Sequence, residues 1–462
     1  MQPLAKETQT LENTAAKLQT LALKAGAERC EVFATYATHT KFTLEKQDYH
    51  LGSSDDGYQF GLRVTLGERQ GFASTNLLES AGLKNLVEQA VTIAKLSPEN
   101  PYNVIASSDN IPHGAPMDLW DDALHRSSIQ TQRQLVKLLM DEACRDKRFR
   151  VTDGTFSIQS GLGLLINSLG IHRLVRETSA NWSLMGMAVD GDRITSFDYF
   201  SQFTRTQQAL PDKVRATTQR FTKRVVDSLQ QGEASSYRGF VVFSPRATAD
   251  VLISAIAHHL NGRNVVEKTG RWNLSEVGKP VLSSQFSLVD DPWRKELSGC
   301  SSFDREGTPT RPVSLMDEGR LKTFLLDHYC ARALGLCSNG SAGGGATSIP
   351  TVSAHSLNVL AGTRTRDELE REVTAQQKDF LVVDRFSGET DPISGDFSGV
   401  AKSAEWFHQG ERAYFLKETL ISGNVFDVLG NSLLGISRET EIVDSSGEFP
   451  TVIAGNVSVT RG

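Results

Sequence analysis

Two adjacent histidines, His258 and His259, stand near the end of the stretch VLISAIAHHLNG, whose apolar residues are typical of a short buried helix. Imidazole is a frequent metal ligand and proton carrier, so the pair is the first candidate for chemistry. Neighbouring residues on a helix project about 100° apart, so the two rings cannot bind one ion together as residues i and i+4 do. At most one of them lines a given site, and a hydrogen-bonded structural role is the alternative for each.

Other segments that carry catalytic residue types do not form a catalytic pattern. The sequence contains no G-x-S-x-G, which gives a serine hydrolase little support. The stretch SNGSAGGGATS lacks the Gly-Lys-Ser/Thr end of a phosphate loop, and we expect a flexible loop beside a cleft. The pairs Asp290-Asp291 and Asp317-Glu318 lie in polar, turn-like surroundings, which favours solvated turns over catalytic carboxylates.

Composition restricts the class of protein. The chain has 462 residues, 39% of them hydrophobic and 23% charged, which predicts a globular protein of two or three domains. The formal net charge of −6 offers no basic face for nucleic acid or anionic lipid. With no long apolar run and no secretory signal at the start, we expect a cytoplasmic protein without membrane spans. Five cysteines without a C-x-x-C pair are expected to be free thiols.

The first of three predicted domains spans residues 1–115. A helix with leucines at helical spacing stops at Gly26, and the alternation in CEVFATYATHTKFTLEK predicts a half-buried strand pair. The pair Asp56-Gly57 predicts a turn, after which two strands and a helix from Leu77 to Leu96 follow. The connector SPENPYNVIASSDNIPHGAPMDLW marks the domain boundary because it is rich in Pro and Asn.

The central domain, residues 116–234, is predicted to combine strands with helices from Thr131 to Arg145 and from Asp212 to Gln231. The third domain, residues 235–462, begins with the apolar strand GFVVFSP, continues with the histidine-bearing helix, and ends in a series of strands. The pattern predicts an α+β fold. Antiparallel strands flanked by helices form its N-terminal part, and a β-rich, barrel-like domain with a few helices forms its C-terminal part.

Several motifs occur in one order along nearly the whole chain, from about residue 28 to 458. They are GLRVTLGERQGFASTN, LLINSLG, VVFSPRATADVLISAIAHHLNG, TPTRPVSLMDEGRLKTFLLDHYCARALG, and SGDFSG paired with KETLISGN. Together they resemble the TldD/PmbA family, whose PmbA members are also called TldE. The resemblance implies two kinds of chain. TldD chains are zinc metallopeptidases with His-Glu-x-x-x-His on a helix and a cysteine near the C-terminus, whereas TldE chains lack this motif and pair with TldD.

Aligning VLISAIAHH with the family motif puts Ile253 at the first histidine, Ser254 at the glutamate and His258 at the second histidine. The family cysteine falls near DSSGEFP, where this chain has Ser445 or Ser446. One imidazole is too few for a protein zinc site, which needs three or four donors. By this resemblance the chain is TldE-like, with no catalytic residue and no cofactor of its own, and zinc is expected in a TldD-like partner.

The function implied by the resemblance is that of a non-catalytic subunit in a system that degrades or trims unfolded peptides. Its partner would be a TldD-like chain in a heterodimer or larger complex, or a second copy of itself in a homodimer. We expect peptide contacts from His258, His259 and the segment Ser422-Gly423-Asn424, and strand addition to an edge formed by KETLISGN and TVIAGNVSVTRG. Barrel closure is the alternative role of those strands.

Two other functions remain open at this point. The chain could be a metallopeptidase in its own right if His258 met His328, His355 or the pair Asp317-Glu318 in space. It could also be a homo-oligomeric peptide-binding protein without a peptidase partner. The negative net charge of the chain gives no reason to expect direct contact with DNA.

Overall fold

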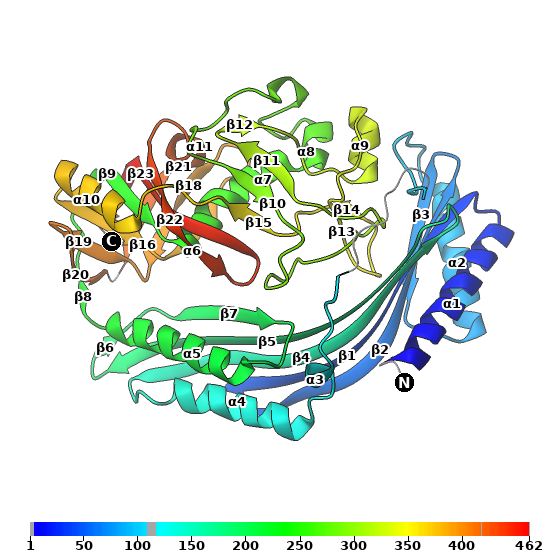
Figure 1. Cartoon of the computed structure of the whole chain (residues 1–462), viewed down its shortest axis with the longest axis horizontal. Coiled ribbons are helices and arrows are strands. Elements are labelled where there is room, and N and C mark those ends of the chain that lie inside the picture. The colour runs from blue at the N-terminus through cyan, green and yellow to red at the C-terminus, as the bar shows by residue number, and fades with distance from the viewer. Residues whose placement is uncertain (1–3, 109–116, 417, 462) are drawn as a thin grey trace.

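The computed structural model describes residues 4–108, 117–416 and 418–461, and it consists of a long curved sheet that wraps around a β-rich region (Figure 1). The curved sheet contains β1 (Arg29–Glu45), β2 (Asp48–Leu66), β3 (Arg69–Thr75), β4 (Phe149–Asn167), β5 (His172–Asp190), β6 (Arg193–Ile194) and β7 (Asp198–Thr204). The strand order is β3-β2-β1-β4-β5-β6, with β7 also paired to β5, and all these pairs are antiparallel.

The strands of this sheet are unusually long. Strand β1 has 17 residues and β2 has 19, so at about 3.3 Å per residue each spans roughly 55 to 60 Å. The prediction of a strand pair within residues 30–46 is therefore wrong, because this segment is one strand. The hairpin turn lies at Lys46 and Gln47, whose φ angles of 50° and 66° suit a tight two-residue turn. Asp56 and Gly57, predicted as the turn, lie inside β2 opposite Thr38 and Ala37.

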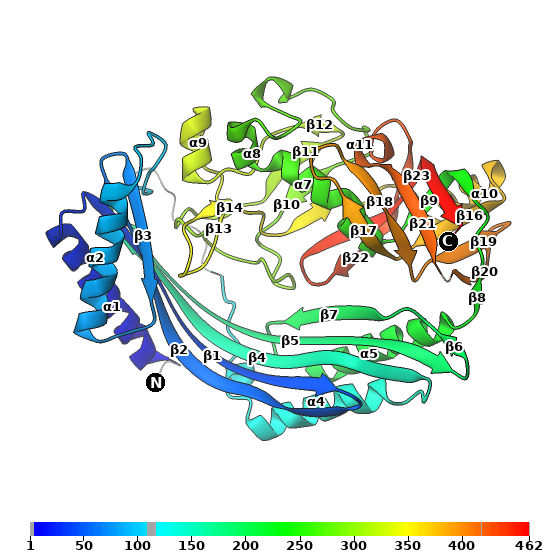
Figure 2. The same ribbon diagram turned by 180° about the vertical axis from the view of Figure 1, so that it is seen from behind.

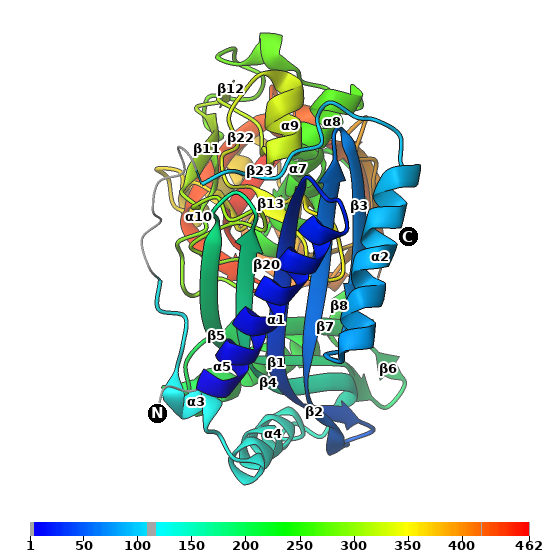
Figure 3. The same cartoon turned by 90° about the vertical axis from the view of Figure 1, so that its right-hand side faces the viewer.

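Helices cover the outer side of the curved sheet at both of its ends (Figures 1 and 3). One end carries α1 (Ala5–Lys24) and α2 (Ser80–Leu96), and the other carries α3 (Asp122–His125), α4 (Ile129–Ala143) and α5 (Leu210–Asp227). Each of these helices except α3 begins or ends within a few residues of the bounds predicted from its apolar spacing. No helix in the described parts of the chain is long and apolar enough to cross a membrane.

The two groups of helices build two separate hydrophobic cores on one sheet. Val32 of β1 packs in the core of α1 and α2, whereas Phe42 of the same strand packs in the core of α4 and α5. The sheet thus runs through both predicted domains, residues 1–115 and 116–234. The boundary predicted between them falls at residues 109–116, outside the described residues, and the three-domain division stays a prediction.

The C-terminal region is built mainly from one ten-stranded sheet. The sheet contains β8 (Gln231–Gly232), β9 (Tyr237–Phe243), β16 (Asp379–Val383), β17 (Arg385–Thr390), β18 (Asp396–Lys402), β19 (Glu405–His408), β20 (Glu411–Leu416), β21 (Thr419–Asn424), β22 (Leu433–Val443) and β23 (Gly447–Arg461). The order is β17-β18-β21-β23-β9-β16-β19-β20-β8, with β22 paired to β23. Figure 2 shows these strands from behind, and the predicted α+β class is confirmed.

Smaller elements complete this region. A four-stranded sheet is formed by β10 (Leu288–Asp290), β11 (Val313–Asp317), β12 (Arg320–Leu321) and β15 (Leu357–Val359), and β13 (Ala342–Gly343) pairs with β14 (Thr351–Val352). The helices are α6 (Pro245–Ala247), a π-helix (Thr248–Ile253), α7 (Ser254–Leu260), α8 (Gly262–Glu267), a 3-10 helix (Leu274–Glu276), α9 (His328–Leu334), α10 (Arg366–Gln376) and α11 (Val425–Val428).

The two predicted carboxylate turns differ in the structure. Asp317 and Glu318 are exposed at a turn, as predicted. The prediction is wrong for Asp290, which is 1% exposed at the end of β10. Its carboxylate accepts the backbone N–H groups of His355 and Ser356 at 2.9 and 2.6 Å. Burial is possible because these donors replace the hydrogen bonds of water.

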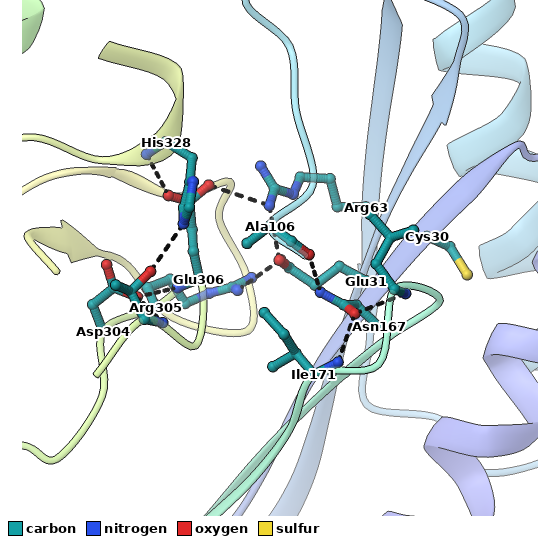
Figure 4. A network of polar contacts seen from close by, with 12 residues as sticks. Cys30, Glu31, Arg63, Ala106, Asn167, Ile171, Asp304, Arg305, Glu306 and His328 are labelled. Carbon is teal, nitrogen blue, oxygen red and sulfur yellow. Dashed lines mark hydrogen bonds and ion pairs between the residues drawn. The ribbon is translucent and has the colours of Figure 1, made fainter. Parts of the chain in front are cut away.

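A buried network of charges joins the curved sheet to the C-terminal region (Figure 4). The carboxylate of Glu31 on β1 accepts from Arg63 on β2 at 2.8 Å and from Arg305 of the C-terminal region at 2.9 Å. Arg63 also lies 3.4 Å from Glu306. All four side chains are at most 5% exposed. Burial alone would raise the pKa of Glu31, but Arg63 and Arg305 outweigh it and hold the pKa below its usual range.

The first prediction concerns the central carboxylate of this network. Glu31→Gln removes a negative charge and leaves two buried guanidinium groups poorly compensated, so we expect a loss of about 3 to 5 kcal/mol in the free energy of unfolding. Urea unfolding followed by tryptophan fluorescence measures this loss. Glu45→Gln on the same strand is the control, because Glu45 is half exposed in its pair with Lys46 and should change stability by less than about 1 kcal/mol. Equal effects of the two substitutions would contradict the role of Glu31.

Candidate functional site

The segment that carries the two histidines follows the apolar strand β9 directly. Ser244 ends the strand and caps the next helix, since its Oγ accepts the N–H of Ala247 at 3.2 Å. The chain then forms the π-helix from Thr248 to Ile253 before it becomes the regular helix α7. A π turn inserts an extra residue and rotates the residues that follow, and such turns are frequent at functional sites. The predicted helix is confirmed, and its irregular first half was not visible in the sequence.

A cavity of about 340 Å³ lies beside this helix. Ile253 and Ser254, the two positions aligned with the family's first histidine and glutamate, both line it. Its opposite wall includes Asp444 and Ser446 from the turn between β22 and β23. Ile253 is 3% exposed, whereas Ser254 is exposed and donates its hydroxyl to the Asp250 carbonyl at 3.3 Å. The structure therefore brings two of the aligned motif positions next to the turn aligned with the family cysteine.

Ser445 itself does not line this cavity. It is 2% exposed, and its carbonyl oxygen accepts both the N–H and the hydroxyl of Ser298, at 2.8 and 3.0 Å. Its φ of 57° lies in the left-handed region that the turn requires. Ser446 therefore occupies the cavity wall at the place where the alignment expected Ser445 or Ser446.

His258 lies in different surroundings from Ile253 and Ser254. Its Nδ1 is 3.1 Å from the amide nitrogen of Asn264, which also donates to the His258 carbonyl at 2.8 Å. Since an amide nitrogen only donates, Nδ1 acts as the acceptor and Nε2 carries the proton. Nε2 is buried without a hydrogen-bond partner. The ring is thus held by Asn264, and it is not part of the cavity wall formed by Ile253 and Ser254.

His259 has a structural role. The side chain is fully buried and packs against Trp272 and Phe426, with ring centroids 5.6 and 5.1 Å away. Its Nδ1 accepts the backbone N–H of Arg271 at 2.8 Å. Burial, with smaller effects from His258 and Arg271, lowers its pKa to about 4. No part of the side chain reaches the surface in this conformation, and contact of His259 with a peptide stays a prediction.

The segment Ser422-Gly423-Asn424 lies within the C-terminal sheet, and its contact with a peptide stays a prediction. It belongs to β21, which pairs with β18 along one edge and with β23 along the other. Strand β23 in turn pairs with β9, β21 and β22. The prediction of a free edge formed by these two strands is therefore wrong, because both strands lie in the interior of the ten-stranded sheet. Asn424 caps α11 by accepting the N–H of Phe426 at 2.9 Å.

The alternative metal ligands do not converge. His328 binds the Thr308 hydroxyl at 2.9 Å, and His355 donates from Nε2 to the Gly340 carbonyl at 2.7 Å. Asp317 pairs with Lys322 at the surface. Within residues 4–108, 117–416 and 418–461, no three His, Cys, Asp or Glu side chains stand close enough to hold a metal ion. The described donors around the histidine-bearing helix therefore do not fit a zinc ion.

Two carboxylates of the cavity wall, Asp250 and Asp444, were missed in the sequence. Asp250 lines the cavity, and the surrounding protein removes water from its carboxylate and raises its pKa to about 6. Arg246 opposes this effect and Asp444 adds to it. A signal was available, because Asp250 stands one helical turn before Ser254, on the same side of the helix.

Two family models match the chain. One describes PmbA/TldA metallopeptidase domain 1 and matches residues 30–94, and the other describes the PmbA/TldA metallopeptidase C-terminal domain and matches residues 236–461. The second match covers nearly the whole of the predicted third domain, residues 235–462. The whole chain belongs to the PmbA/TldD family, as its resemblance predicted.

Known proteins resemble the chain over most of its length. The metalloprotease PmbA homolog of Haemophilus influenzae is 27% identical, over 93% of this chain and 92% of its own length. Metalloprotease PmbA of Escherichia coli O157:H7 is 26% identical, over 80% of this chain and 79% of its own. The crystal structure of TldE from Thermococcus kodakarensis matches with a TM-score of 0.85 at 21% identity, and covers 98% of this chain and 100% of that chain. This structural match shows a shared fold.

The second prediction concerns the buried His259. Its pKa of about 4 lies below the ordinary value of 6.5, so the unfolded chain takes up the proton first as the pH falls. The stability contributed by neutral His259 is present above pH 6.5 and is lost as the pH falls towards 4. From pH 7 to pH 5 this loss is about 2 kcal/mol.

Denaturant unfolding at both pH values tests this prediction. His259→Gln keeps an acceptor for the Arg271 N–H but does not titrate, so its loss of stability between pH 7 and pH 5 should be smaller than that of the wild type by about 2 kcal/mol. His50→Gln is the control, because His50 is exposed. An unchanged pH dependence in the His259 variant would show that the buried ring does not determine it.

Proposed function

We propose that this chain is a non-catalytic, TldE-like subunit of a cytoplasmic peptidase complex, in which a TldD-like partner holds zinc and cleaves unfolded peptides. One observation carries the proposal. The cavity beside the histidine-bearing helix is present, but Ile253 and Ser254 line it at the positions that the family motif assigns to histidine and glutamate. The names of relatives, which include several metalloproteases, support peptide chemistry as the setting of this fold.

The chemistry of the cavity wall supports a non-catalytic role. A catalytic zinc site needs about three protein ligands and an open position for water. The side chain of Ile253 has no donor atom, and the hydroxyl of Ser254 is not a base near neutral pH. The third motif position, His258, is turned towards Asn264. Activation of water by a metal at this cavity has no basis in the residues present.

The remaining tasks for such a subunit are assembly and the holding of substrate. Ile253 is apolar and buried, so it packs stably in the cavity wall. A histidine at this position without a bound metal would instead leave a buried polar group without a partner. The hydrogen-bond donors and acceptors that remain around it include Ser254, Ser446 and His355. Such a wall suits contact with the backbone of a peptide better than its cleavage.

The third prediction is that the chain, purified alone and without a metal-binding tag, contains far less than one zinc ion per molecule. The reason is the missing donor set at Ile253 and Ser254. Plasma mass spectrometry measures the zinc content, and a TldD-like chain with an intact His-Glu-x-x-x-His, purified in the same way, serves as the positive control. About one zinc per chain in this protein would refute the proposal and would require ligands outside the family motif.

The fourth prediction concerns peptide turnover. We expect no cleavage of an unfolded peptide by this chain alone, and cleavage when a TldD-like chain is added. Ser254→Ala in this chain should leave the turnover of the mixture unchanged, whereas Glu→Gln in the partner's motif should abolish it, since only the partner supplies a general base. Cleavage that depends on Ser254 would contradict a non-catalytic role. If the TldD-like chain cleaved the peptide equally fast with and without this chain, a homo-oligomeric peptide-binding protein would be favoured instead.

A further inference from the structure

A second cavity, of about 250 Å³, lies between the curved sheet and the C-terminal region, next to the first. Tyr199 and Gln202 of β7 line one side, and Glu441 and Ile442 of β22 line the other. Figures 1 and 2 both show β7 running beneath β22. Val443 and Asp444 line both cavities, so this second cavity adjoins the wall that carries Ile253 and Ser254. We call it the arginine cavity, after Arg220, Arg224, Arg246 and Arg366 in its lining.

Both strands that border the arginine cavity have an unpaired edge there. In the described parts of the chain β7 pairs only with β5. Strand β22 pairs with β23 along one edge and is bridged to Arg364 at Ser437 on the other, so its free edge is the part nearer the cavity, around Glu441 and Ile442. The N–H of Ser201 on β7 donates to the carboxylate of Asp444, in the turn after β22, at 3.3 Å. Backbone groups are therefore available to an extended chain at this place.

Next to the cavity lies a largely buried cluster with more positive than negative charge, of which Arg224, Arg246 and Asp384 line the cavity itself. The carboxylate of Asp198 lies 2.9 Å from Arg224, 3.0 Å from Arg246 and 3.3 Å from Arg385. A second carboxylate, Asp384, lies 2.7 Å from Arg224 and 3.9 Å from Arg246. Three guanidinium groups thus share two carboxylates. Nη2 of Arg246 and Nε of Arg224 are buried without a hydrogen-bond acceptor, and a buried N–H without an acceptor is costly.

Arg220 adds a further positive charge to the same wall. It stands on α5 one turn before Arg224, it is exposed, and it forms no ion pair or hydrogen bond with any described residue. The wall formed by β22 is acidic instead, since Glu441 and Asp444 line it. The cavity is therefore polarised, with arginines on one side and carboxylates on the other. The acidic wall would repel a polyanion. A ligand with a single carboxylate and adjoining backbone N–H groups fits better, because the carboxylate can pair with the arginines and the N–H groups can face the acidic wall.

Exposed apolar side chains extend from this cavity over the surface. Phe197 is 48% exposed and stacks beneath Arg385, and Ile442 is 38% exposed in the cavity wall. Tyr199, 38% exposed, lies under Arg246 with 4.5 Å between the guanidinium carbon and the ring centroid. Exposed apolar groups around a polar pocket are typical of a surface that binds another chain.

We propose that the arginine cavity binds a carboxylate of an extended peptide, with the carboxylate on Arg220 and Arg246 and the adjoining backbone along the free edge of β22. The carboxylate is either the C-terminal group of the peptide or an Asp or Glu side chain. The inference rests on the proposed function only in taking a peptide as the ligand. It assigns to this chain a site for the charged end of a substrate, beside the cavity that has lost its catalytic residues.

Fluorescence anisotropy on the purified full chain tests this site. The probes are a short labelled unstructured peptide with a free C-terminus, the same peptide with a C-terminal amide, and the amide with one internal Asp. We expect the free acid to bind about tenfold more tightly than the amide, the range of a charge-assisted hydrogen bond. Tight binding of the internal-Asp amide, lost in the Arg220 variant, would assign the site to side-chain carboxylates. Its absence would assign the site to the C-terminus.

Arg220→Gln should bring the binding of the free acid to the level of the amide and leave the amide unchanged, and it should fold normally because Arg220 has no partner to lose. Arg133→Gln on α4 is the matched control, since Arg133 is exposed and lies outside the cavity. Equal affinity of acid, amide and internal-Asp amide, or an Arg220→Gln variant that binds the free acid as the wild type does, would overturn the inference. If none of the peptides bound, the inference would also be overturned. The partner-subunit proposal is tested separately, by zinc content and by peptide turnover.

Discussion

The carboxylate of Glu31 binds two guanidinium groups that come from opposite sides of the junction between the curved sheet and the C-terminal region. Such buried charges are expensive to remove from water, and the cost is offset only while all partners stay in place. Arg305 is therefore fixed over the sheet by an interaction that tolerates little displacement. Both cavities of the candidate site include residues of the C-terminal region, which this network joins to the curved sheet.

Local pattern was sufficient for the helices and for the class of the fold. The apolar spacing of α2 and the glycine at the end of α1 gave elements close to those observed. Long strands were harder, because the turn pair Asp56-Gly57 has the right residue types but lies opposite Thr38 and Ala37 within a 19-residue strand. The pairing of β1 with β4 over 15 residue pairs decides this, and it joins segments more than a hundred residues apart. Tertiary pairing overrode turn propensity.

The candidate site, too, was predictable where it depends on local sequence and not where it depends on tertiary contacts. One short segment was enough to place Ile253 and Ser254 together on a helix, because their relation is local. The different environments of the two histidines were not predictable from the sequence. Asn264 binds His258 and the backbone N–H of Arg271 binds His259, and both partners come from the chain after the helix has ended. The free edges at β7 and β22, and the full pairing of β21, result from contacts between distant strands. The same holds for Asp290, whose two backbone donors lie about 65 residues further on.

Loss of metal ligands changes what a cavity wall can do. A wall of unpaired histidine and glutamate would expose polar groups that need a metal or water, whereas Ile253 packs without such a partner. The polar groups that persist lie at the borders, where Asp444 and Val443 separate this cavity from the arginine cavity. A turn of only three residues, Asp444 to Ser446, thus contributes to both cavities. A peptide bound in the arginine cavity would contact this turn, whose residues also line the cavity of Ile253 and Ser254. Binding at the arginines could therefore affect, through the turn, the wall where the catalytic residues are missing.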